Sequence, residues 1–165
     1  MSIDILRRLF VFVLLCLAQV LVLNRIQLFH CAMPLLYVYL AIVFPRNYPR
    51  WAILLWCFAM GVCVDAFSNT PGVAAASMTL VGVLQPYLLE LFLPRDAEEE
   101  IKSSVKTLGL GKFSTLASIL TLLYCLVFYA IESFSFFNWL YWLECVGGST
   151  LITLVLILTL ESVRK

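Results

Sequence analysis

Residues 51-WAILLWCFAMGVCVDAFSNTPG-72 are the most informative part of the sequence for the fold. Residues 51–67 carry a single charged side chain, Asp65, in an otherwise apolar run. At about 1.5 Å per helical residue, such a run approaches the roughly 30 Å thickness of a bilayer's hydrocarbon core. The polar residues that follow are helix caps, and Pro71 suits the first turn of a second helix. The stretch therefore predicts a membrane-spanning helix, a tight turn and a further helix.

The whole chain has the same apolar character. Its 165 residues are 63% hydrophobic and 13% charged, against about 45–50% and about 25% in soluble domains. A single soluble core of this length cannot bury so much apolar surface, so lipid must cover much of it. The net charge of +1 gives no argument for a nucleic-acid partner. We therefore expect an all-α integral membrane protein with one domain.

Six apolar runs approach the length of a membrane span, which predicts a six-helix transmembrane bundle. They are residues 9–26, 32–44, 51–67, 72–93, 113–131 and 139–160. The second run is the shortest and has Pro34 near its start. It is either a short tilted span or a re-entrant segment buried among the others.

The positive charges support six spans. Lys and Arg favour the cytoplasmic side of short loops. With six spans the outer segments hold only Arg25, and the inner segments hold Arg7, Arg8, Arg46, Arg50, Arg95, Lys102, Lys106, Lys112, Arg164 and Lys165. Omitting the second span would move most of these cations outside. We therefore expect a multi-pass membrane protein with both termini in the cytoplasm.

Residues 94–112 form the one sizeable polar segment. Asp96 and Glu99 have the spacing of a capping box, and Ile101, Val105 and Leu108 form one apolar stripe. We expect a cytoplasmic amphipathic helix on the inner membrane surface. A docking surface for a cytoplasmic partner is the alternative.

The sequence offers little for catalysis. His30 is the only histidine, and no two of the six cysteines form a Cys-x-x-Cys pair. We therefore expect no enzymatic activity, no metal and no cofactor. The cysteines lie almost wholly in apolar runs and are interpreted as small packing residues.

Asp65 is the most informative polar residue. A charged group in the hydrocarbon region costs at least about 2.5–3.5 kcal/mol, so it usually has a partner or a function. Gly61 lies on the same helix face and would let another helix approach the carboxylate. Asp65 either only ties the hairpin together, by accepting hydrogen bonds from Ser68, Asn69 or Thr70, or also serves a partner or ligand. In the next helix, Gln85 stands beside Pro86, which should kink it.

Residues 61–72, GVCVDAFSNTPG, resemble the signature of MreD, the bacterial rod shape-determining membrane protein family. Further similarity covers most of the chain, at Arg7-Arg8, residues 33–37, Phe44-Pro45 and residues 85–87. The chain departs from the family where relatives often carry a histidine after the turn, because it has Val73 and Ala74 there.

The resemblance implies a non-catalytic scaffold of the cell-elongation complex, located in the bacterial inner membrane. Its partners would be MreC, the actin-like MreB filament, RodA and the penicillin-binding transpeptidase that extend peptidoglycan. The residues expected to contact a partner or ligand are Gly61, Asp65, Ser68, Asn69, Thr70, Pro71, Gly72, Gln85 and Pro86. The family is also similar in fold to the substrate-binding subunits of energy-coupling-factor transporters. The rival expectation is therefore a small-solute binding or transport subunit, with a polar pocket reached by Asp65, Gln85 and Glu144.

Overall fold

The computed structural model describes residues 2–23, 32–45, 48–92, 108–133 and 138–163. These residues form six helices: α1 (Ser2–Leu21), α2 (Val38–Ile42), α3 (Arg50–Ser68), α4 (Val73–Phe92), α6 (Leu110–Ser133) and α7 (Trp139–Val163). Four of them, α3, α4, α6 and α7, are long and apolar enough to cross a membrane. The prediction of an all-helical, multi-pass membrane protein is confirmed at this level.

The observed helix bounds differ from the predicted runs at several ends. α1 begins and ends earlier than the predicted 9–26 span, and it takes in the charged residues Arg7 and Arg8. α6 begins at Leu110, so residues 110–112 belong to a long helix rather than to the predicted amphipathic segment 94–112. Gly109, just before α6, has φ of 82°, a conformation that favours glycine. The rest of that segment, up to residue 107, lies outside the described residues, as does His30.

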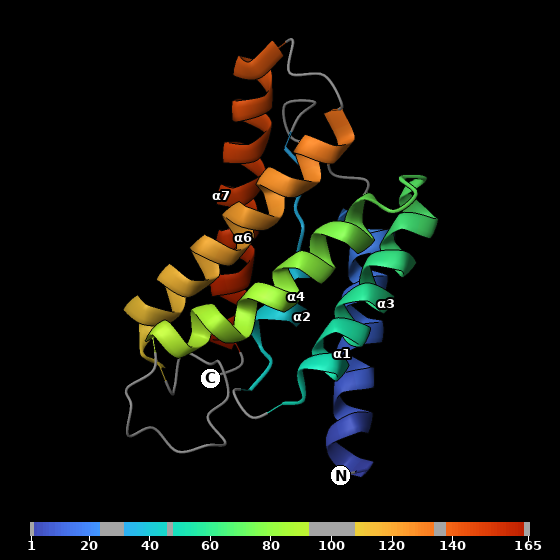
Figure 1. Ribbon diagram of the computed structural model, residues 1–165, viewed down its shortest axis with the longest axis vertical. Coiled ribbons are helices and arrows are strands. Elements are labelled where there is room, and N and C mark those ends of the chain that lie inside the picture. The colour runs from blue at the N-terminus through green and yellow to red at the C-terminus, as the bar shows by residue number, and fades with distance from the viewer. Residues whose placement is uncertain (1, 24–31, 46–47, 93–107, 134–137, 164–165) are drawn as a thin grey trace.

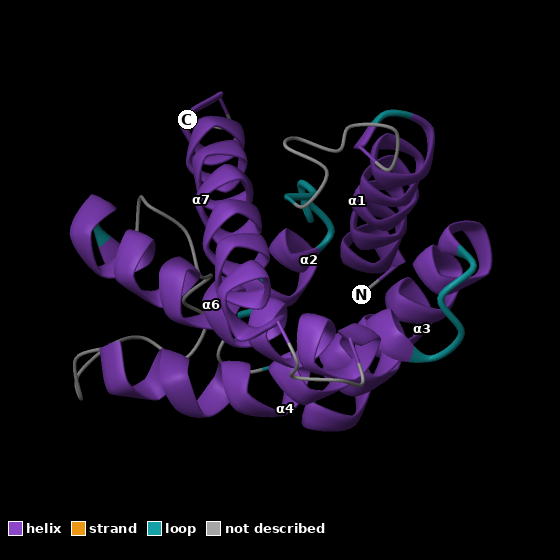
Figure 2. Ribbon diagram, turned by 90° about the horizontal axis from the view of Figure 1, so that it is seen from above, coloured by secondary structure: helices purple, strands orange, loops and turns teal. Residues whose placement is uncertain are grey.

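Five helices surround the sixth. Figure 2 shows α1, α3, α4, α6 and α7 arranged in an arc, with the short α2 inside it. In Figure 1, α1 and α3 run in the same direction, so the chain between them must return along the length of the bundle. Residues 32–45 make this return, and nearly all their side chains are buried.

This returning segment is only partly helical. Residues 33–35 are extended, a turn follows, and α2 covers only Val38–Ile42. The six residues outside the turns and α2 (32–35, 44 and 45), taken at roughly 3.3 Å each, and the eight turn and helix residues at roughly 1.5 Å each add to about 32 Å. The segment is therefore long enough to match a hydrocarbon core, although an unbroken helix of the same residues would be too short. The segment is buried among the other helices, and the choice between a short span and a re-entrant segment stays a prediction.

An extended backbone inside a membrane protein needs hydrogen-bond partners, because lipid offers none. Hydroxyl groups of α7 supply two of them. The Met33 amide donates to Ser149 Oγ at 3.1 Å, and the Leu35 amide donates to Thr153 Oγ1 at 3.0 Å. The two hydroxyls, four residues apart on α7, thus lie on one face of the helix.

Two buried glutamines hold the same segment from other helices. Gln19 of α1 donates from Nε2 to the Pro34 carbonyl at 2.9 Å, and its Oε1 accepts from the Leu36 amide at 3.1 Å. Gln85 of α4 donates to the Phe44 carbonyl at 3.1 Å. The side-chain amides of Gln19 and Gln85 thus take the place of the helical hydrogen bonds that this segment lacks.

Arginine side chains stack on tyrosine rings at the end of the bundle where α1 and α3 begin. Arg8 lies 4.0 Å from the centre of the Tyr48 ring. Arg50 lies 5.0 Å from the centre of the Tyr87 ring and donates to its hydroxyl at 3.0 Å. Such cation–π pairs keep a charge near water while its neighbours face apolar surroundings.

One cysteine is not a simple packing residue. Cys16, Cys57, Cys63 and Cys125 are free thiols. Cys145, near the start of α7, is disulfide-bonded, and its partner lies outside the described residues. The interpretation of all six cysteines as packing residues is therefore wrong for Cys145. Sequence spacing alone did not reveal the bond, because the bonded residues need only be close in space.

Candidate functional site

The Asp65 carboxylate is bound to the first turn of α4. Its Oδ1 accepts hydrogen bonds from the Ala74 amide at 2.9 Å and from Thr70 Oγ1 at 3.1 Å. Its Oδ2 accepts from the Ala75 amide at 2.9 Å. The first amides of a helix have no partner within the helix and carry partial positive charge, so a carboxylate there is strongly favoured. Asp65 is 5% exposed, and its charge is directed into the hairpin.

The turn between α3 and α4 brings these groups together. Asn69 has φ of 57°, a left-handed conformation that asparagine tolerates, and its amide donates to the Asp65 carbonyl. The Thr70 amide donates to the same carbonyl at 3.4 Å. Gly72 has φ of 86°, which favours glycine at this position. Ser68 ends α3 and Pro71 precedes Gly72, so the whole predicted turn is used to reverse the chain.

Gly61 lets the two helices approach each other one turn before Asp65. A Cβ atom at Gly61 would lie 2.4 Å from Ala75 Cα and 2.8 Å from the Ala74 carbonyl oxygen. Both neighbours are backbone atoms and cannot rotate away. The same two residues, Ala74 and Ala75, donate their amides to Asp65. Gly61 and Asp65 therefore both serve the contact between α3 and the first turn of α4, Gly61 by leaving space for the backbone and Asp65 by accepting its hydrogen bonds.

The hairpin role considered for Asp65 is confirmed in the structure, with a change in the donors. Of the three expected donors, Thr70 bonds to the carboxylate, while Asn69 bonds to the Asp65 carbonyl instead. The two main donors, the amides of Ala74 and Ala75, were missed. They are backbone groups, which a comparison of side chains does not reveal. The polar turn just before α4 was nevertheless a signal, because the first amides of a helix are free to donate to a nearby carboxylate. A contact of this hairpin with a partner or ligand stays a prediction.

Gln85 and Pro86 lie elsewhere on α4. Gln85 is eleven residues beyond Ala74, or about 16 Å along the helix axis. Its side-chain Nε2 donates to the Phe44 carbonyl, and among the described residues its Oε1 has no hydrogen-bond partner. Pro86 lies inside α4. Gln85 therefore supports the returning segment, and neither residue takes part in the hydrogen bonds of Asp65.

The polar pocket expected from the transport hypothesis does not form from the residues named for it. Asp65 is bound to α4, Gln85 is buried against Phe44, and Glu144 is exposed on α7. Glu90, another membrane-embedded carboxylate in the sequence, is also exposed.

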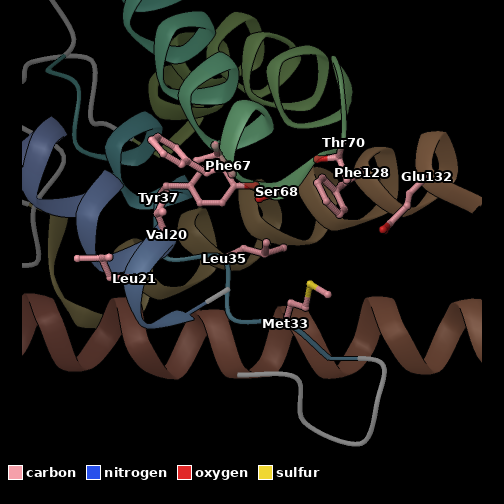
Figure 3. Close-up of a pocket in the computed structure, with 11 residues that line it drawn as sticks. Val20, Leu21, Met33, Leu35, Tyr37, Phe67, Ser68, Thr70, Phe128 and Glu132 are labelled. Atoms are coloured by element: carbon pink, nitrogen blue, oxygen red, sulfur yellow. The ribbon is translucent and has the colours of Figure 1, made fainter. Parts of the chain in front are cut away.

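A different pocket of about 650 Å³ lies between α1, the extended segment, α3 and α6. Figure 3 shows its lining, which is largely apolar. Its polar members are Ser68 and Thr70 of the turn, and Glu132 near the end of α6. Ser68 and Thr70 were expected to contact a partner or ligand, whereas Glu132 was missed. No motif marks Glu132, because the lining comes from four separate parts of the chain.

Comparisons of this chain with protein-family models, with curated proteins and with solved structures found no match.

Proposed function

We propose that this chain is a non-enzymatic membrane scaffold of the bacterial cell-elongation complex. It would help maintain rod shape by coupling MreB and MreC to RodA and the penicillin-binding transpeptidase. The observation that carries the proposal is the correspondence between residues 61–72, which resemble the MreD signature, and the α3–α4 hairpin. Gly61, Asp65 and the turn residues combine in one close helix contact.

A scaffold needs a rigid surface on which a partner can pack. The hairpin supplies rigidity because the Asp65 bonds fix α4 against α3. On its outer side, α3 exposes Trp51, Leu55, Phe58 and Val62. Their spacing of three or four residues places them on one face of the helix. We propose that the membrane helix of an MreC-like partner packs on this face, where lipid would otherwise lie.

The proposed orientation follows the charges. Arg8 and Arg50 lie at the helix ends that we assign to the cytoplasmic side of the inner membrane. Lys112, near the start of α6, belongs to the same side. The start of α7 lies at the opposite end of the bundle (Figure 1), Cys145 follows six residues after Trp139, and a disulfide there suits the oxidising periplasm. The cytoplasmic side would then face the MreB filament.

The first experiment depletes the protein in its host and restores it in variant forms. We expect rounded cells on depletion, and normal rods with the unchanged chain. Phe58→Glu places a charge on the exposed face of α3 and should prevent rescue while leaving the hairpin contacts intact. Leu151→Glu, on an exposed face of α7, is the matched control for the effect of a charge facing lipid.

A photo-crosslinking residue at position 58 should capture an MreC-like or synthase protein, and one at position 151 should not. Depleted cells that keep their width, or equal capture at both positions, would contradict the proposal. Insertion of each variant is checked by its level in isolated membranes.

A further inference from the structure

Glu132 lies between two neighbouring cavities at the end of the bundle opposite the N-terminus. The larger cavity of about 650 Å³ and a smaller one of about 170 Å³ share Glu132 and Met33 in their linings. Figure 3 shows Glu132 extending from α6 on the same stretch of the helix as Phe128. The two cavities together are within the usual size range of small-molecule sites.

Aromatic rings line both cavities next to this carboxylate. Tyr37, Phe67 and Phe128 line the larger one, and Tyr129, Tyr141 and Trp142 line the smaller one. The hydroxyls of Tyr37 and Tyr129 are already hydrogen-bonded, to Tyr124 and Ser149 respectively. Their rings rather than their hydroxyls are therefore left to a ligand. A negative charge combined with several ring faces is the arrangement that attracts organic cations.

Glu132 has no counterion in the described part of the chain. Among the described residues it has no hydrogen bond and no ion pair, unlike Asp65, whose oxygens are all engaged. By the charge assignment, the sequence has a single arginine, Arg25, on this side of the protein, while Glu132 and Glu144 both lie there. This end therefore favours a positively charged molecule.

We infer that Glu132 and the aromatic rings of the two cavities form a binding site for a small organic cation. The ligand would carry a primary or quaternary ammonium group on a compact, partly apolar body. The ammonium would lie against Glu132 and the rings, and the body would fill the apolar part of the larger cavity. Its source would be either a free amine from the periplasm or the head group of phosphatidylethanolamine. The inference is independent of the scaffold proposal.

Isothermal titration calorimetry on the purified full chain in detergent micelles tests the inference. The probes are choline, ethanolamine and 3,3-dimethylbutan-1-ol, which is a neutral molecule of nearly the same shape as choline. We expect saturable binding of at least one cation and none of the neutral probe. Glu132→Gln should weaken binding tenfold or more, equivalent to about 1.4 kcal/mol. Glu144→Gln removes an exposed carboxylate that does not line either cavity and should bind normally.

Met33→Trp gives a second test that keeps the charge, because the larger side chain would fill the space shared by both cavities. It should abolish binding even if Glu132→Gln proves unstable. The inference is overturned if no cation binds, if the neutral probe binds equally well, or if both Glu132→Gln and Met33→Trp bind like the unchanged protein.

Reconstitution distinguishes the two sources of the ammonium group. The same titration is performed in nanodiscs of phosphatidylglycerol alone and in nanodiscs that also contain phosphatidylethanolamine. Weaker binding of the soluble cation in the second lipid mixture indicates that the head group occupies the site. Equal binding in both mixtures indicates a free amine.

Discussion

Replacing Gly61 by alanine tests the central contact of the hairpin with the smallest possible change. The added Cβ would lie 2.4 Å from Ala75 Cα, whereas ordinary contacts begin at 3.4 Å. Since the obstacle is backbone, α3 and α4 must separate by about 1 Å. The same movement would stretch the bonds from the Ala74 and Ala75 amides to Asp65, now 2.9 Å each, to about 3.9 Å. At that distance they no longer count as hydrogen bonds.

The expected loss of stability combines three effects. Overpacking of a tight contact costs about 1–3 kcal/mol. Hydrogen bonds to a charged group contribute about 1.5–3 kcal/mol each, and partial relaxation would lose about 2 kcal/mol of the two together. Alanine is favoured over glycine within a helix by about 1 kcal/mol. The net expectation for Gly61→Ala is a decrease of about 2–4 kcal/mol in the free energy of unfolding.

The assay is equilibrium unfolding in mixed micelles with increasing SDS, followed by the fluorescence of the four tryptophans. Gly147→Ala is the matched control, because a Cβ at that position in α7 meets no atom within 4 Å. We expect it to be neutral or up to about 1 kcal/mol more stable. If the two variants unfold at the same SDS fraction, the close approach of α3 and α4 is not a determinant of stability.

Three further predictions concern the supports of the fold. Asp65→Asn should lower the free energy of unfolding by about 2–3 kcal/mol, because one carboxylate oxygen is replaced by an NH₂ group that cannot accept a hydrogen bond from the helix N-terminus. The double variant with Gly61→Ala should lose less stability than the two single variants added together, as a double-mutant cycle in the same assay would show. Gln19→Leu should cost about 2–3 kcal/mol by leaving the Pro34 carbonyl and the Leu36 amide unpaired, and unchanged stability would contradict this assignment. Maleimide should modify four cysteines of the denatured, unreduced chain and all six after reduction. In Cys145→Ser the disulfide partner becomes a free thiol, so the unreduced chain should show five modified cysteines.

The parts of the fold that follow simple length rules could be predicted from the sequence. The apolar runs 51–67 and 72–93 correspond to α3 and α4, and the Ser-Asn-Thr-Pro-Gly turn between them was recognised from its residue types. The partners of Asp65 could not be predicted in the same way, because the Ala74 and Ala75 amides depend on where a backbone lies. A sequence shows which side chains exist but not which backbone groups face them.

The candidate cation site had no sequence signal for a related reason. Glu132 was one of several acids near the ends of predicted spans, and nothing in its neighbourhood distinguishes it from Glu144. Both side chains are exposed, and the difference is that Glu132 lines two cavities formed by residues from separate segments, whereas Glu144 lines neither. The transport hypothesis predicted a pocket lined by the polar residues within the spans, whereas the larger cavity next to Glu132 is lined mainly by apolar residues.

The returning segment 32–45 shows why a fixed rise per residue misjudges a short span. A helix of its residues would fall well short of the roughly 30 Å hydrocarbon core, but its partly extended backbone reaches that length. This backbone is possible only because side chains of α1, α4 and α7 satisfy its polar groups. If the segment crosses the membrane, Val22 and Pro49 lie on opposite sides. In a background without the free cysteines, an impermeant maleimide applied to intact cells should label Val22→Cys and spare Pro49→Cys. Equal labelling would mean that the segment returns to the side from which it came, and that the charges of every later loop must be reassigned.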